Sequence, residues 1–312
     1  MKIRIFLLCL LSFNCLSQGK LSSNAFYNFD NDKQSGVRYY TTWGNKYKNY
    51  NFGIMNGVRY YVQDTSYKSL TDFRFNISHT FKSELYFNYN ISILNTKDWN
   101  ILFFDGAIRY PYKKFNFELY TERETIGTPK TIDLKLSSLF IGVSFDYKIN
   151  DRFTLVNGVS NNNISDGNNR WYTVNRLSYT FENEKSYIDL KINNMFSGDW
   201  SPNYFSPERS LESTSGFGFY KNIFKNKYYL KFYIASGFQN ISTDYNNLTL
   251  INFKLTTNFE KNFYGEISYG LRKVNDYGYS YGQFRIIYNV NKPHIKHDPI
   301  MLYNEPTRFY HK

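Results

Sequence analysis

A candidate nucleophile, Ser160, lies near the middle of the chain. It belongs to the pair Ser160-Asn161, which is followed by a polar loop and then by Arg170-Trp171. A serine hydroxyl becomes a nucleophile when a neighbouring base accepts its proton, and histidine is a common base. The histidines of the chain are far from Ser160 in the sequence: His79, His294, His297 and His311. The residues around Ser160 therefore predict no catalytic site.

A second group that could do chemistry is His294-Ile295-Lys296-His297, followed by Asp298. Two imidazoles and a carboxylate can hold a divalent ion weakly. The surrounding segment is polar and rich in proline, which is typical of a disordered tail. Both cysteines, Cys9 and Cys15, precede residue 18, so the rest of the chain has no thiolate ligand. We expect no metal and no cofactor.

Charged residues recur at every second position of several segments. Side chains of a strand alternate between two faces, so these residues would share one face. Both signs are present, which favours ion pairs that stiffen a wall of neighbouring strands. Together with Tyr86, Tyr120 and Tyr264, the same face could guide a hydrophilic chain, because aromatic faces can stack on sugar rings. The residues expected to line this polar lumen are Arg59, Arg74, Glu84, Asp105, Arg109, Glu118, Glu122, Asp146, Arg176, Asp189, Lys191, Lys231, Lys254, Glu266, Arg272 and Arg285.

A loop with prolines and aromatic rings, residues 197–209, is the most individual stretch. Its prolines argue against a strand, and its three rings argue against a merely solvated loop. Such a loop either packs on itself as an outer cap or folds inward as a gate, and we favour the gate. The gating residues would be Trp200, Pro202, Tyr204, Phe205, Pro207, Glu208 and Arg209.

The elements that position these residues are predicted to be strands. Between Leu21 and Asn291, sixteen segments alternate apolar and polar residues and are separated by clusters of Asn, Asp, Gly, Lys or Ser. In one of them, Leu85, Phe87 and Ile91 share an apolar face that suits lipid, while the other face suits water. Aromatic rings stand at both ends of the apolar faces, as in the girdles of membrane barrels. The pattern predicts an all-β fold, a transmembrane antiparallel β-barrel of about sixteen strands.

The links between segments support this topology. Short links are expected around 46–49, 112–114 and 150–151, and long ones at 125–136, 162–169 and 197–209. Outer-membrane barrels have short periplasmic turns and longer outer loops. An even strand number then places both termini in the periplasm. A barrel of this size has a lumen open to water unless loops fold into it.

The chain divides into three predicted parts: a signal peptide (1–17), the barrel (18–291) and a periplasmic tail (292–312). Basic Lys2 and Arg4 precede an apolar stretch, as in secretory signals. Removing these two residues leaves 36 basic against 26 acidic residues, a net charge of +10. No later apolar run could cross a bilayer as a helix, and 21% of the residues are aromatic. We expect a bacterial outer-membrane protein in contact with lipid, and no nucleic-acid partner.

Two motifs carry a family resemblance. Tyr204-Phe205-Ser206-Pro207-Glu208-Arg209, followed by Gly216-Phe217-Gly218-Phe219-Tyr220, resembles the corresponding element of YaiO-type outer-membrane barrels. It is also similar to the terminal barrels of cellulose and poly-N-acetylglucosamine export porins. The resemblance implies passage or surface handling of an exopolysaccharide, with periplasmic export proteins as partners. The chain lacks the helical-repeat scaffold of the large export porins.

A second resemblance concerns Ser160-Asn161 and Arg170-Trp171. This stretch is similar to that around the active serine of outer-membrane phospholipase A, and more loosely to lipid A deacylase. In those families a histidine stands two residues before the serine, whereas this chain has Gly158. We therefore predict a non-enzymatic pore or surface barrel. The alternatives are a lipid hydrolase and a structural or partner-binding barrel with a closed lumen.

Overall fold

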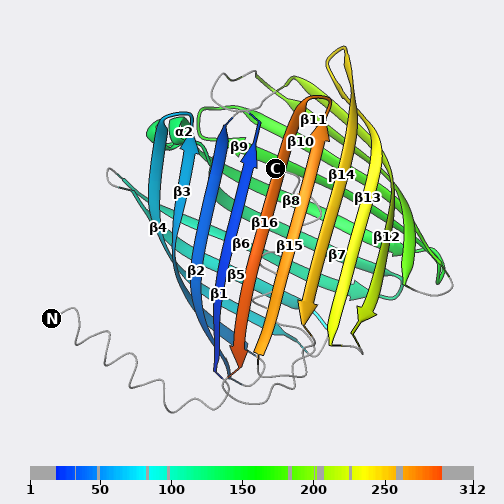
Figure 1. Cartoon of the computed structure of the whole chain (residues 1–312), viewed down its shortest axis with the longest axis horizontal. Helices are drawn as coiled ribbons and strands as arrows, with labels where there is room; N and C mark the ends of the chain where they lie inside the picture. The colour runs from blue at the N-terminus through cyan, green and yellow to red at the C-terminus, as the bar shows by residue number, and fades with distance from the viewer. Residues whose placement is uncertain are drawn as a thin grey trace.

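Sixteen antiparallel strands form one closed barrel in the computed structural model (Figure 1). The structure describes residues 19–31, 33–47, 50–81, 84–96, 99–181, 185–199, 201, 207–224, 227–257 and 263–289. Consecutive strands pair, and β1 pairs with β16, so the predicted fold class and strand number are confirmed. The strands are β1 (Lys20–Asp30), β2 (Gln34–Tyr47), β3 (Tyr50–Gln63), β4 (Ser66–Thr80), β5 (Tyr86–Asn95), β6 (Asn100–Tyr112), β7 (Phe115–Thr125), β8 (Ser137–Lys148), β9 (Phe153–Ile164), β10 (Asn169–Thr180), β11 (Ser186–Ser197), β12 (Arg209–Ile223), β13 (Tyr228–Ile241), β14 (Asp244–Thr257), β15 (Phe263–Val274) and β16 (Tyr277–Asn289).

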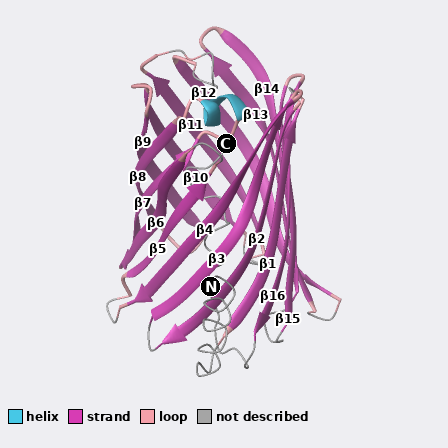
Figure 2. Ribbon diagram, turned by 90° about the vertical axis from the view of Figure 1, so that its left-hand side faces the viewer, coloured by secondary structure: helices cyan, strands magenta, loops and turns pink. Residues whose placement is uncertain are grey.

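The two ends of the barrel differ. Lys20 is paired with Asn289, so β1 begins and β16 ends at the same end, which we call the terminal end. The opposite end carries a short helix, α2 (Pro129–Asp133), between β7 and β8, and we call it the helix end (Figure 2). Within the described residues no helix is long and apolar enough to span a membrane. The periplasmic location of the termini stays a prediction.

Loop lengths follow the prediction only in part. The two longest connections, 126–136 and 198–208, both lie at the helix end. Three other connections at that end are two-residue turns, at 64–65, 242–243 and 275–276. Long loops are therefore not the rule at the helix end. The length of each connection depends on the turn residues between its two strands.

The long loop predicted at 162–169 is wrong. Strand β9 continues to Ile164 and β10 begins at Asn169, which leaves only the turn 165–168. The side-chain amide of Asn161 donates across the ladder to Asn169 Oδ1 at 2.5 Å, and that of Asn163 donates along the same strand to Asn161 Oδ1 at 2.8 Å. Side-chain bonds of these two kinds accompany the Asn-rich segment where it continues as a strand.

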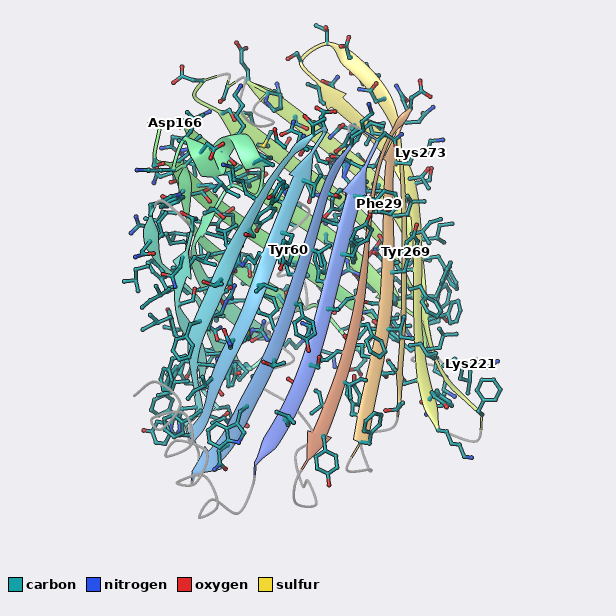
Figure 3. The ribbon with its side chains drawn as sticks, turned by 60° about the vertical axis from the view of Figure 1, so that its left-hand side comes forward. Phe29, Tyr60, Asp166, Lys221, Tyr269 and Lys273 are labelled. Atoms are coloured by element: carbon teal, nitrogen blue, oxygen red, sulfur yellow. The ribbon has the colours of Figure 1, made fainter. Side chains whose placement is uncertain are left out.

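The outward face is apolar and carries aromatic rings at both ends. At the terminal end the rings of Phe115 and Tyr147 lie 4.7 Å apart, and at the helix end those of Tyr27 and Phe29 lie 5.6 Å apart. Phe29, Tyr60 and Tyr269 are exposed on their strands (Figure 3). Because closure pairs the strands without a free edge, only these outward side chains need to be apolar in lipid.

Candidate functional site: the barrel interior

The interior of the barrel is polar and charged. Burial alternates most clearly along β3, β4 and β5, and the covered positions face inward. In β3, Met55, Arg59 and Tyr61 are buried while Asn56 and Tyr60 are exposed. The residues of the predicted polar face that lie at inward positions of their strands are Arg59, Arg74, Asp105, Arg109, Glu118, Glu122, Asp146, Arg176, Asp189, Lys191, Lys231, Lys254, Glu266, Arg272 and Arg285.

Glu84 is the exception, and its predicted place in the lumen wall is wrong. It lies in the turn before β5 with a left-handed backbone (φ 63°), and it is exposed. The Glu84 amide donates to the carbonyl of Phe81 at 3.0 Å, so the chain turns here and the alternation begins only at Tyr86.

One buried ion network centres on Arg59 and Asp72. Arg59 Nε and Nη2 donate to the Asp72 carboxylate at 3.0 and 2.8 Å, and Arg74 Nε donates to its two oxygens at 2.9 and 3.0 Å. The side chain of Arg59 is 1% exposed and that of Asp72 0%. Charges at this depth are tolerated only when they are paired and hydrogen-bonded, as they are here.

The network also joins parts of the wall that are not neighbours. Glu124 of β7 accepts a hydrogen bond from Arg59 of β3 and lies 3.5 Å from Arg38 of β2. Strands β3 and β7 are separated by three others, so this contact crosses the interior. Our sequence analysis missed Arg38, Asp72 and Glu124. The alternation was a sufficient signal, since Asp72 is two residues from Arg74 and Glu124 is two residues from Glu122.

The loop between β7 and β8 folds into the barrel. Its helix α2 contacts β3 and β4, and Ile132 is 2% exposed. Ile132 packs in a cluster with four inward side chains from β3 to β6: Tyr61, Leu70, Leu94 and Phe103. Asp133 lies 2.5 Å from Lys68 of β4. The helix therefore fills part of the interior at the helix end.

Sequence analysis found this loop but not its role. Thr128 caps the helix by accepting from the Thr131 amide at 3.2 Å, and Pro129 stands in the first turn. A threonine at the N-cap followed directly by proline is a helix-start signal within a loop. That signal could have identified α2 as a packed element.

The opposite wall carries rings and cations, and we call it the basic–aromatic wall. Arg176 Nε and Nη2 donate to Asp189 Oδ2 at 2.7 and 2.6 Å, and Tyr233 Oη donates to Asp189 Oδ1 at 3.0 Å. The stacked rings of Tyr187 and Tyr233 lie 6.2 Å apart. The wall consists of Arg176 in β10, Tyr187 and Asp189 in β11, Tyr220 in β12, and Lys231 and Tyr233 in β13.

Three further contacts complete this wall. The rings of Tyr187 and Tyr220 are stacked at 5.6 Å. Arg176 lies over the Tyr187 ring and Lys231 over the Tyr220 ring, each at 5.6 Å from the centroid. Each cation–π contact stabilises by about 0.5–2 kcal/mol. The Tyr187 and Tyr220 rings are therefore fixed by these contacts, and Arg176 and Lys231 cover part of their faces.

Two glycines of β12 make room for these rings. A Cβ built on Gly218 would lie 2.3 Å from the Tyr187 ring, and one on Gly216 would lie 2.4 Å from Tyr233 Oη and 2.7 Å from Asp189. Real Cβ atoms do not approach so closely, so a side chain at either position would displace the neighbouring tyrosine ring. Both glycines face inward, and Tyr187 and Tyr233 lie over them; we call Gly216 and Gly218 the glycine floor.

Ser160, the candidate nucleophile, also lies in the barrel wall. It is buried in β9, and its hydroxyl has no hydrogen-bond partner in the described part of the protein. Gly158 stands two residues earlier in the same strand. His79, the one histidine among the described residues, stacks at 4.0 Å on Tyr50 and at 4.3 Å edge-on with Phe81 at the terminal end. Among the described residues, therefore, no imidazole lies beside Ser160.

The predicted gate lies mostly outside the described residues, which exclude Trp200, Pro202, Tyr204 and Phe205. At its base the Ser197 amide donates to the Glu208 carbonyl at 2.9 Å, and the Gly198 amide donates to Asn169 at 2.8 Å. Glu208 and Arg209 are exposed there, and Pro207 is half-buried. The gating role of this loop stays a prediction.

Metal ligation is not supported in the described residues, which hold no group of three or more His, Cys, Asp and Glu residues placed to bind an ion. His294 and His297 lie outside them, as do the predicted signal peptide (1–17) and the tail (292–312).

No family model and no curated protein matches this chain. A solved structure described as a bacterial polysaccharide outer membrane secretin is 10% identical, with a TM-score of 0.72 over 88% of this chain and 99% of that chain. OccK7 (OpdD) of Pseudomonas aeruginosa is 7% identical, with a TM-score of 0.47 over 88% and 98%. OccAB2 of Acinetobacter baumannii is 10% identical, with a TM-score of 0.45 over 88% and 98%. At these identities the first similarity concerns the fold, and the two weaker ones carry no argument.

The fold and the two faces define the class of protein. A closed barrel with an apolar, ring-bearing exterior around a charged interior is a transmembrane β-barrel of the bacterial outer membrane.

Proposed function

We propose that this protein is a non-enzymatic outer-membrane channel that guides a polysaccharide through its lumen. The observation on which this proposal rests is the basic–aromatic wall, where a row of stacked tyrosine rings lies over two glycines on the inner surface. A ring has an apolar face that can stack on a sugar, and charged neighbours can bind its hydroxyls.

Two further lines support the proposal. The fold is similar over most of both chains to a protein described as a polysaccharide outer membrane secretin. The motifs 204–209 and 216–220 resemble those of YaiO-type barrels and export porins, and the second of them contains the glycine floor. On this proposal the partners are outer-membrane lipid, the polysaccharide and periplasmic export proteins.

The second candidate is a structural barrel with a closed lumen. It is favoured by the covered ion network at Arg59 and by α2, which fills part of the interior. Conduction separates the two candidates, because a closed barrel passes no current.

The test uses residues 18–312, which contain no cysteine, refolded and inserted in a planar bilayer. A single cysteine is introduced inside at Lys254 (Lys254→Cys) or outside at the exposed Lys221 (Lys221→Cys). We expect stable single-channel current, and a bulky charged thiol reagent should reduce it only for the inner cysteine. Absence of current from every preparation would favour the closed barrel.

Sugar binding is measured with cellohexaose, a neutral β-1,4-linked glucose hexamer, added to the conducting channel. We expect transient blockades whose duration falls about five-fold in Tyr220→Leu, which corresponds to one lost stacking contact of about 1 kcal/mol. Tyr269→Leu removes an exposed outward ring and is the matched control. Equal blockade durations in the two variants would contradict a role for the inner rings.

A further inference from the structure

The inner wall formed by β10 to β16 is strongly basic. Its inward acidic residues are Asp189, Glu212 and Glu266, with Asp244 at the rim. Its inward basic residues are Arg170, Arg176, Lys191, Lys231, Lys254, Arg272 and Arg285. The excess of positive charge therefore belongs to one half of the lumen, the half that carries the tyrosine row.

Two pairs of cations stand directly opposite each other in this half. Arg176 is the cross-strand partner of Lys191, and Lys231 is the partner of Lys254. Like charges in directly opposite positions destabilise a sheet, and swapping one residue would remove the repulsion. A sequence that keeps both pairs facing the lumen indicates a use for concentrated positive charge there.

The acids that accompany these cations are the less exposed partners. The Arg176 side chain is 34% exposed and its partner Asp189 is 1% exposed. Lys254 is 27% exposed and Glu266 is 3%. On the opposite side of the barrel, the Arg109 side chain is 31% exposed and its partner Glu118 is 1% exposed. In these three pairs the cation is the partner that is more accessible from the lumen, whereas Arg272 and Glu212 are equally exposed at 17% each.

We propose that the lumen selects anionic chains, such as a polysaccharide bearing carboxylates or phosphates. This inference rests on the proposed channel function and deepens it. The row of rings would support the apolar faces of sugars, and Arg176, Lys191, Lys231 and Lys254 would bind their charges. Clefts lined by one sign of charge concentrate the opposite ion, and the effect weakens as salt screens it.

The first measurement is the zero-current potential of the channel across a KCl gradient near 0.1 M, where the screening length is about 10 Å. We expect chloride to be favoured over potassium by on the order of three-fold, with the ratio approaching one near 1 M salt, where that length is about 3 Å. The double variant K231Q/K254Q should lower the ratio about two-fold. The control K221Q/K273Q removes the same charge from exposed outward positions and should leave it unchanged.

The second measurement compares two probes of equal length: cellohexaose and the corresponding hexamer of β-1,4-linked glucuronate. We expect the glucuronate to block the wild-type current at least about ten-fold longer, a difference of about 1.4 kcal/mol, and K231Q/K254Q to reduce this preference. The thermal midpoint of the double variant should fall, because Lys254→Gln leaves the buried Glu266 carboxylate without its cation, whereas K231Q alone keeps that ion pair.

The outcomes separate the two proposals. Without any current, the channel function itself fails. Current with no anion preference and equal blockades by the two probes would leave a channel but overturn the selectivity inference. A lower thermal midpoint together with unchanged selectivity in K231Q/K254Q would assign these lysines a purely structural role and also overturn it.

Discussion

Docking of α2 inside the barrel should depend on one side chain, Ile132. It is 2% exposed and is packed among residues of four strands, whereas Leu134 in the same loop is 50% exposed. Ile132→Ala should weaken docking by about 2 kcal/mol, at the lower end of the 2–5 kcal/mol range for such truncations because only a short loop must adjust. The undocked fraction should then rise about 30-fold. Leu134→Ala should change docking by less than about 0.5 kcal/mol.

The assay is limited trypsin digestion of the refolded barrel, with fragments identified by mass. Lys130 and Lys135 lie in this loop, and cleavage there requires that the segment leave its place. When opening and closing are fast, the cleavage rate follows the undocked fraction. We expect Ile132→Ala to be cut about 30-fold faster at these sites than the wild type, and Leu134→Ala about as fast as the wild type. Equal rates in both variants would refute the idea that Ile132 anchors the helix.

Two more predictions concern the interior. Asp72→Asn should lower the free energy of unfolding by about 3 kcal/mol or more in a denaturant titration in lipid, because it leaves two buried guanidiniums short of a carboxylate. Asp133→Asn, which breaks a half-exposed pair, should cost less than about 1 kcal/mol, and equal losses would contradict the difference in burial. Gly218→Ala should displace the inner Tyr187 and shorten the cellohexaose blockade, whereas Gly106→Ala, which meets the outer ring of Tyr89 at 2.4 Å, should not. An unchanged blockade in Gly218→Ala would separate the ring row from sugar binding.

Alternation along the strands predicted the fold and most of the inner face. The period of two places Arg59, Glu118 and Asp189 inside whatever their neighbours are, because strand geometry alone decides which way a side chain points. It failed at Glu84, where the chain turns before the strand begins. It also failed at 162–169, where the Asn161 side chain bonds to Asn169 across the ladder and the Asn-rich segment continues as a strand.

Contacts across the barrel could not be predicted in the same way. The hydrogen bond between Arg59 and Glu124 joins strands β3 and β7, and the packing of Ile132 on Tyr61 joins a loop to the wall. Such contacts depend on how the closed sheet curves and how far each loop reaches, and neither follows from the local pattern. Sequence analysis accordingly identified a gate at 197–209 and missed α2, which the described residues show inside the barrel.

The two glycines of β12 belong both to the motif that resembles export barrels and to the wall that carries the inner tyrosine rings. Gly216 and Gly218 belong to the motif that resembles the export barrels, and in the structure both lie on the inward face beneath Tyr187 and Tyr233. A glycine in a strand weakens it, so two at the same face need a compensating use. The space they leave is filled by rings that line the lumen and by the carboxylate of Asp189. Close glycine–ring contacts also occur at Gly57, Gly106 and Gly270, so the blockade assay on Gly218→Ala is the measurement that assigns the pair in β12 to binding or to packing.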